Sequence, residues 1–123
     1  MFGKLFKSKD SAPAPSDETL NIAEIPHANG KIKFRYSRRL SSDGQKWIRH
    51  GLFVAYHENG VVSSEGHYDD GLEVGVWKSF HENGKVASEG SYRQGKEDGV
   101  WRFWNDHGQE EKPVRYANGE EVV

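Results

Sequence analysis

The chain of 123 residues contains no cysteine and no long apolar run. Without cysteine it can form neither disulfides nor thiolate metal sites, and thiol catalysis is excluded. No stretch approaches the roughly 20 consecutive apolar residues that a membrane-spanning helix needs. The first ten residues also lack the apolar core of a secretory signal. We therefore expect a soluble, cytoplasmic protein.

Hydrophobic residues are scarce as well, at 34%, whereas the chain has 14 glycines and 12% aromatic residues. Glycine is typical of tight turns, and aromatic rings supply apolar surface where aliphatic side chains are few. No window beyond the N-terminus shows a sustained 3.6-residue apolar period, so helices are not expected there. The composition favours β-structure with many turns.

Charge is distributed unevenly along the chain, although the net charge is only −2. Residues 31–50 carry seven basic side chains and one acidic side chain, for a net charge of +6. Residues 51–123 carry 14 acidic and 7 basic side chains, for a net charge of −7. Such asymmetry bears on partners rather than on the fold. The acidic part would repel a phosphate backbone, so no nucleic-acid partner is expected.

From residue 51 onward the sequence repeats with a period of 24 residues, in the copies 51–74, 75–98 and 99–122. A fixed period of this length indicates a repeat architecture. Glycine or aromatic residues occupy six positions in every copy. These positions are Gly51/Gly75/Gly99, Phe53/Trp77/Trp101, Tyr56/Phe80/Trp104, Gly60/Gly84/Gly108, Tyr68/Tyr92/Tyr116 and Gly71/Gly95/Gly119.

Each copy contains two short segments that end at turn signals. The first, such as VWKSFH, ends at Asn-Gly or His-Gly, and the second, such as KVASEGSY, ends at Asp-Gly, Gln-Gly or Asn-Gly. Asn-Gly and Asp-Gly favour the positive φ angles of a type I′ turn, so each copy is predicted to be a β-hairpin. The predicted fold is therefore all-β, an elongated antiparallel meander of stacked hairpins.

The regions that flank the full copies are less regular. Residues 1–19 include the Pro/Ser-rich stretch SAPAPSDE, which predicts a flexible tail. Residues 20–50 are interpreted as a degenerate N-terminal capping repeat, whose alternating strand over 31–36 carries charges that suit an exposed edge. The third copy, with its C-terminal cap, extends over 99–123. Its Pro113 predicts that the strand containing it is the last edge.

The repeated pattern G-x-W-x-x-[FY]-x-x-N-G-K, followed by S-E-G-x-Y-x-x-G, resembles the MORN repeat. It is most similar to the variant in bacterial YwqK-like proteins, which are often classed as antitoxins. The resemblance covers 51–122 well and 27–50 loosely. It implies a half-pipe of hairpins that binds phospholipids or proteins, and for the YwqK-like variant it implies neutralisation of a cognate toxin. The third copy departs from the pattern, because Lys112-Pro113-Val114 replaces the Ser-Glu-Gly step.

The stretch HENG occurs at 57–60 and again at 81–84, and it places His57-Glu58 and His81-Glu82 before glycine turns. Equivalent histidines on neighbouring hairpins would lie about 10 Å apart, which is too far to share one metal ion. The spacing of a zinc-binding HExxH helix is also missing. We therefore expect polar residues that flank turns, with no catalytic residue, metal ion or cofactor.

The partner-binding surface is expected to be acidic and lined by aromatic rings. Glu65 and Glu89 alternate away from the tyrosines and would form a row of carboxylates for a basic partner, or a solvated face with cross-strand partners such as Lys85. One aromatic column must build the core while another lines a groove, and the sequence does not decide which. The predicted partner-binding residues are Tyr56, Glu65, Trp77, Phe80, Glu89, Trp101 and Trp104.

The leading hypothesis is a non-enzymatic antitoxin or immunity protein that binds a basic protein toxin. The alternatives are a membrane-surface adaptor, for which weak membrane contact is expected, and a purely structural scaffold. A capping strand explains the basic residues of 31–39 equally well. The oligomeric state is left open. The predicted contacts with an anionic surface are Lys4, Lys7, Lys31, Lys33, Arg35, Arg38 and Arg39.

Overall fold

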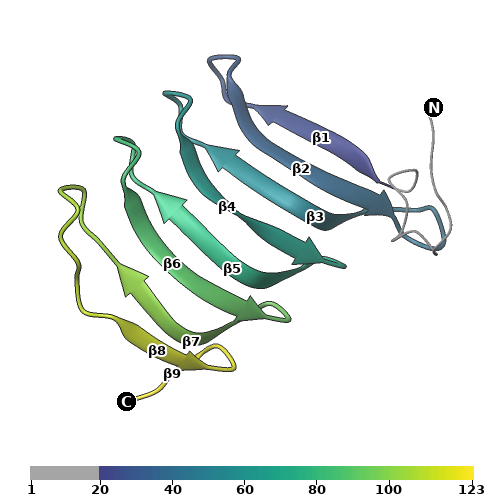
Figure 1. The fold of residues 1–123 in the computed structure, drawn as a ribbon. Coiled ribbons are helices and arrows are strands. Elements are labelled where there is room, and N and C mark those ends of the chain that lie inside the picture. The colour runs from purple at the N-terminus through teal and green to yellow at the C-terminus, as the bar shows by residue number, and fades with distance from the viewer. Residues whose placement is uncertain (1–19) are drawn as a thin grey trace, which may run out of the picture.

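The computed structural model describes residues 20–123, which form one open antiparallel sheet of nine strands in sequence order (Figure 1). This confirms the all-β meander, while the predicted tail over 1–19 lies outside the described residues. No helix able to cross a bilayer occurs within 20–123. The strands are β1 (Asn21–Pro26), β2 (Ile32–Leu40), β3 (Trp47–Tyr56), β4 (Val62–Asp69), β5 (Leu72–Phe80), β6 (Val86–Arg93), β7 (Lys96–Phe103), β8 (Val114–Ala117) and β9 (Glu120–Glu121).

The Asn-Gly turns that follow β1, β3 and β5 line one edge of the sheet (Figure 1) and are not of type I′. In the turn between β3 and β4, Gly60 has a φ of 92°, whereas Asn59 is not among the residues with positive φ. The amide of Gly60 donates to the carbonyl of His57 at 2.9 Å, and the amide of His57 donates to that of Val61 at 2.8 Å. This is a three-residue loop with a type I turn and a left-handed glycine. Since Asn59 Oδ1 accepts from the Val61 amide at 3.0 Å, its side chain stabilises this alternative.

On the opposite edge, the turns that follow β4, β6 and β8 have the predicted type I′ geometry, whereas Asp43 in the longer loop between β2 and β3 has no positive φ. Asp70 and Gly71 both have positive φ angles, of 49° and 88°, and they connect the paired residues Asp69 and Leu72. The mirror-image turn matches the right-handed twist of the flanking strands. Equivalent pairs with positive φ are Gln94-Gly95 and Asn118-Gly119.

A bulge bends each of the strands β3, β5 and β7 near its middle. Between β4 and β5 the pairing changes from Glu65↔Lys78 to His67↔Val74. Over this stretch β5 advances by four residues while β4 advances by two. Gly75 lies in this bulge with a φ of 70°. Gly51 and Gly99 occupy the equivalent places, and the resulting curvature of the strands is visible in Figure 1.

The core is a continuous ladder of rings on one side of the sheet, which we call the ring face. Adjacent ring centroids lie 5.1–6.4 Å apart, mostly in edge-on geometry. Phe53 and Trp101 are buried, at 6% and 8% exposure. The sequence did not decide which aromatic column builds the core. The structure shows that it is the column Phe53/Trp77/Trp101. The ladder consists of Phe34, Tyr36, Phe53, Tyr68, Trp77, Tyr92, Trp101 and Tyr116.

The glycine of each Ser-Glu-Gly step makes room for a tryptophan on the next strand. A Cβ added at Gly66 would overlap the ring of Trp77, and one at Gly90 would overlap that of Trp101. Each indole N–H then donates to a nearby backbone carbonyl at 3.1 Å, His67 for Trp77 and Ser91 for Trp101. In the third copy no further tryptophan follows, which explains why valine is tolerated at the equivalent position 114.

Two predictions about the sheet edges are wrong. Residues 32–36 of the basic segment belong to β2 and lie between β1 and β3, because residues 21–26 form an additional strand that pairs with β2. Pro113 precedes β8 rather than interrupting a ladder, and the two-residue strand β9 follows as the last element.

Candidate functional site

The histidines of the HENG turns connect successive hairpins. His57 Nε2 donates to the carbonyl of Phe80 at 2.7 Å, and His81 Nε2 donates to that of Trp104 at 2.8 Å. His27 makes the same bond, at 2.8 Å, to the carbonyl of Tyr56. Facing a carbonyl, the Nε2 atom must carry the proton. These side chains flank the turns and, by bonding to the next hairpin, fix the spacing between repeats.

The asparagines of the same turns form a second, parallel series of bonds. Asn59 Nδ2 donates to the carbonyl of Glu82 at 3.0 Å, and Asn83 Nδ2 donates to that of Asp106 at 2.7 Å. The last turn has no following hairpin, and there Asn105 replaces the histidine and bonds to Gln109 within its own turn. The last copy thus departs from the HENG pattern where nothing remains to be connected.

The side of the sheet opposite the rings, which we call the charge face, carries Glu65 and Glu89. Glu65 lies directly opposite Lys78, and Glu89 lies between Lys78 and Arg102. Arg102 also pairs with Glu110 at 2.9 Å. The two carboxylates therefore alternate with bases across neighbouring strands, and their cross-strand partner is Lys78 rather than Lys85. This arrangement is typical of a solvated, internally balanced face.

The structure divides the seven predicted partner-binding residues between the two faces. Trp77 and Trp101 belong to the ring ladder, where Trp101 is buried and Trp77 is half-buried. On the charge face, Tyr56 lines a groove with the aliphatic side chains of Ile22, Leu52 and Val54. The remaining members of that face are half-buried Phe80, Glu65, Glu89 and Trp104, the last with Arg102 5.0 Å from its ring.

A second acidic series lies on the ring face and was missed from the sequence. Glu73 is directly opposite Tyr68, Glu97 opposite Tyr92, and Glu121 opposite Tyr116. We call these six residues the Tyr–Glu row, since tyrosine and glutamate alternate over the consecutive strands β4 to β9. Within 20–123, no ion pair involves any of the three glutamates. The sequence signal was a seventh column at 24-residue intervals.

The negative charge of this row shifts the pKa of Tyr92. Burial raises the pKa of the Tyr92 hydroxyl above 10.0, and the carboxylates of Glu97 and Glu73 raise it further. Because the two carboxylates disfavour the tyrosinate anion relative to the neutral phenol, the electrostatic potential at this site is negative. The row can therefore attract cations.

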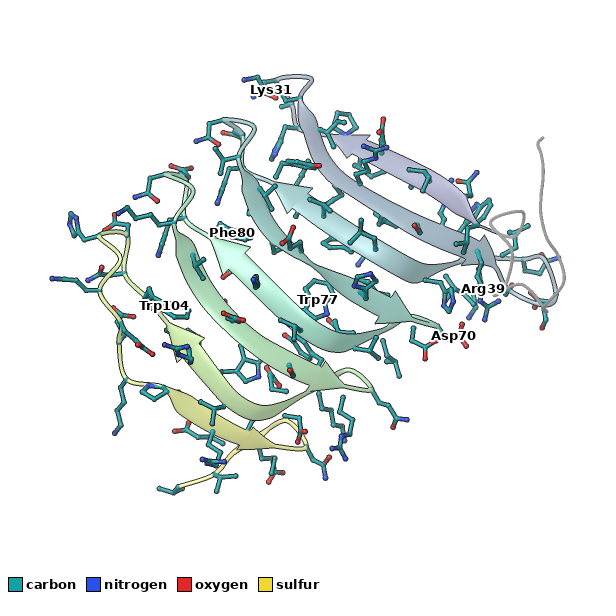
Figure 2. The ribbon with its side chains drawn as sticks, viewed as in Figure 1. Lys31, Arg39, Asp70, Trp77, Phe80 and Trp104 are labelled. Atoms are coloured by element: carbon teal, nitrogen blue, oxygen red, sulfur yellow. The ribbon has the colours of Figure 1, made fainter. Side chains whose placement is uncertain are left out.

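The predicted contacts with an anionic surface do not form one patch. Arg35 pairs with Glu24 at 3.3 Å on the charge face, and Arg39 pairs with Asp70 at 2.7 Å at the edge of the sheet (Figure 2). Lys31 lies at a turn, Lys33 stands 5.2 Å from the ring of Phe34, and Arg38 lies beside Trp47. Lys4 and Lys7 fall outside the described residues.

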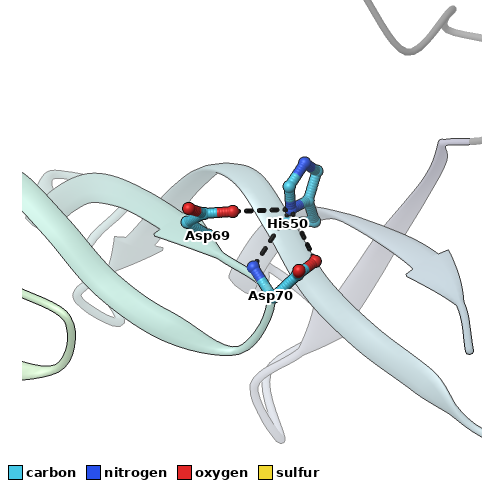
Figure 3. A group of neighbouring side chains, drawn as sticks. All are labelled: His50, Asp69 and Asp70. Atoms are coloured by element: carbon cyan, nitrogen blue, oxygen red, sulfur yellow. Dashed lines mark hydrogen bonds and ion pairs between the residues drawn. The ribbon is translucent and has the colours of Figure 1, made fainter.

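Three potential metal ligands meet where the first type I′ turn abuts β3 (Figure 3): His50, Asp69 and Asp70 each offer an atom within 4.8 Å of the others. However, His50 Nδ1 already accepts the Asp70 amide at 3.1 Å. Arg39 donates to the Asp70 carboxylate through two nitrogens, at 2.9 and 2.7 Å, and lowers the pKa of that carboxyl. The sequence did not predict this cluster, which fastens the turn to β2 and β3.

These features define a repeat protein of stacked β-hairpins that presents fixed rows of side chains on two faces. Two segments of the chain, residues 49–70 and 73–94, match the MORN repeat variant. MORN repeats commonly mediate protein or membrane interactions and are generally not enzymes. A search of curated proteins found no match to the chain.

Proposed function

We propose that the chain is a non-enzymatic protein-binding module that presents the Tyr–Glu row to a basic partner. The observation that carries the proposal is the set of three carboxylates, Glu73, Glu97 and Glu121, without a basic partner in residues 20–123. They stand on every second strand, about 10 Å apart. Tyrosine rings between them offer faces for cation–π contact with lysine or arginine.

The sheet holds this row in place before a partner arrives. Each glutamate is anchored by a backbone ladder, and its neighbouring tyrosine is packed edge-on against a ladder ring, such as Tyr92 against Trp101 at 5.1 Å. Such preorganisation reduces the entropy lost on binding. The net charge of −7 over 51–123 would also accelerate association with a basic protein.

The finer proposal is an antitoxin or immunity role in the cytoplasm, in which the row covers the active site of a basic protein toxin. The resemblance of the repeats and the sign of the charge support it. Toxins that act on nucleic acid are commonly basic, so an acidic surface suits them. Co-expression with the protein encoded by the adjacent gene tests the role: growth should be rescued by this chain. If the neighbour is harmless, or remains toxic, the antitoxin role is rejected.

The binding surface itself is tested by a triple substitution, Glu73→Gln, Glu97→Gln and Glu121→Gln. We expect affinity for the neighbour's product to fall at least tenfold and to lose much of its dependence on salt. The matched control replaces Glu58, Glu82 and Glu111, which are exposed and lie outside the strands, by glutamine and so removes the same charge elsewhere. Equal loss in both triple variants would indicate general charge attraction and would remove the Tyr–Glu row as the site.

The second candidate is a membrane-surface adaptor. Exposed lysines at the N-terminal end of the sheet, Lys31 and Lys33, and the common role of MORN repeats favour it. Sedimentation with vesicles that contain phosphatidylserine tests it at low salt. Binding that disappears when Lys4, Lys7, Lys31 and Lys33 are replaced by glutamine supports the adaptor. Absence of binding to these vesicles removes it.

A further inference from the structure

Two arginines face each other across neighbouring strands without an acid between them. Arg38 of β2 is directly opposite Arg49 of β3. Like charges in this position destabilise a sheet unless something neutralises them. Within residues 20–123, neither arginine lies in an ion pair at 4.0 Å or less. The pair is thus a concentrated positive charge that the described part of the chain does not balance.

Both guanidinium groups are held by aromatic rings. The Arg49 Cζ atom lies 4.9 Å from the ring centroid of Tyr36, 5.2 Å from that of Phe53 and 5.5 Å from that of Tyr68. Its Nη1 donates to the Tyr68 hydroxyl at 3.3 Å. These contacts fix the plane of the guanidinium without using its charge in an ion pair.

Arg38 is fixed in a similar way. Its Cζ atom lies 4.2 Å from the ring centroid of Trp47, and its Nε donates to Asn21 Oδ1 at 3.0 Å. Trp47 is 46% exposed, so this end of the ring face is open to a ligand. Two planar guanidinium groups, both oriented by rings and both accessible, suit the two oxygens of a carboxylate or phosphoryl group.

We propose that Arg38 and Arg49 bind an oxyanion, a carboxylate or phosphoryl group, carried by the same protein partner that the Tyr–Glu row binds. This inference rests on the proposed function. In the 24-residue register, Arg49 is the counterpart of Glu73, Glu97 and Glu121. The column Arg49/Glu73/Glu97/Glu121 is therefore positive at its first member and negative at the next three. A partner segment that crosses the strands has an oxyanion at one end, followed by basic residues about 10 Å apart.

The same row disfavours an anionic bilayer as the source of the oxyanion. Glu73 and Glu97 share the ring face with the two arginines and lie opposite Tyr68 and Tyr92. A flat surface of lipid headgroups would meet these carboxylates at the same time as the arginines, and like charges would repel. A protein segment can place its oxyanion against the arginines and its basic residues against the glutamates.

The experiment titrates the full chain with inorganic pyrophosphate and follows the arginine side-chain Nε–H resonances by NMR. We expect saturable shifts at Arg38 and Arg49, with affinity at least tenfold weaker in Arg38→Gln and in Arg49→Gln. Arg115→Gln is the matched control, since Arg115 is an exposed arginine of β8 with no ion pair in the described residues. It should bind pyrophosphate like the unsubstituted chain.

Circular dichroism and thermal melting establish that each variant is folded, and Arg49→Lys should retain partial affinity if Arg49→Gln melts early.

Linear shifts without saturation, or equal losses in Arg115→Gln, would show general ion attraction and overturn the proposal. Binding to phosphatidylserine vesicles that both arginine substitutions abolish would assign the pair to lipid and overturn the protein source. The Glu73/Glu97/Glu121 triple variant should bind pyrophosphate at least as tightly as the original chain. Failure of the Tyr–Glu row to bind a partner therefore remains distinguishable from failure of the arginine site.

Discussion

The indole of Trp77 lies directly over the backbone of Gly66, so closely that a single added methyl group would overlap the ring. The two residues belong to adjacent strands, and the indole N–H completes the contact by donating to the carbonyl of His67 at 3.1 Å. The same relationship recurs between Trp101 and Gly90. The glycine of the Ser-Glu-Gly step is therefore part of the core, since it provides space rather than flexibility.

Substitution of Gly66 by alanine tests this relationship. We expect a loss of about 2–3 kcal/mol in the free energy of unfolding, because the ring of Trp77 must move away from its neighbours Phe53 and Tyr68. Urea denaturation monitored by tryptophan fluorescence measures the loss. Ser63→Ala on the same strand is the control and should change stability by less than about 0.5 kcal/mol. A fully stable Gly66→Ala variant would contradict the close approach of the ring.

Removal of one of the histidine side chains that bond to the next hairpin should weaken the connection between two hairpins. We expect His57→Ala to cost about 1 kcal/mol, because the carbonyl of Phe80 loses its donor and the imidazole is partly buried. The control is His107→Ala in the turn between β7 and β8, where the side chain is 82% exposed and its one ion pair within the described residues is with Asp106. Chemical denaturation should show little effect there, and equal effects at both positions would contradict a specific role for the histidine bond.

The 24-residue period allowed the sheet, the hairpins and the ring columns to be predicted, because all of these repeat locally. The histidine bonds could not be predicted, since His57 and Phe80 belong to different copies and meet only once the hairpins stack. The strand of residues 21–26 could not be predicted either, because it contains a proline and is too short to show a clear alternation.

The choice between the two acidic series depended on cross-strand register. Glu65 and Glu73 both recur at 24-residue intervals, as Glu89 and Glu97, so periodicity alone treats them alike. The bulge at Gly75 brings Lys78 opposite Glu65 and leaves Glu73 opposite Tyr68. The length of that bulge is a property of the paired backbone, and the sequence signals only that a glycine is present.

The ion pair between Arg39 and Asp70 predicts a defined dependence of stability on pH. A hydrogen bond from Arg39 lowers the pKa of the Asp70 carboxyl below 3.8, so the contribution is present above that pH and disappears as the pH falls through the lowered value. Asp70→Asn retains a residue that tolerates the φ of 49° and removes the charge. We expect this variant to be less stable than the original chain near neutral pH and equal to it in strong acid. A difference that persists in acid would show that the substitution acts through the turn rather than through the ion pair.

The Tyr–Glu row predicts a change in the titration of Tyr92 when a neighbouring carboxylate is removed. Burial is the larger cause of the raised pKa of Tyr92, and the charge of Glu97 is the next. Glu97→Gln should therefore bring the pKa of this hydroxyl closer to 10.0 without restoring that value fully. Tyrosinate absorbance as a function of pH measures the shift, with Tyr92→Phe to identify the transition.

Because the folded state keeps this proton longer than the unfolded state, the chain should lose stability as the pH rises above 10.0, and less so in Glu97→Gln. Glu111→Gln is the matched control, and a shift of equal size there would mean that Tyr92 senses the net charge of the chain rather than the row.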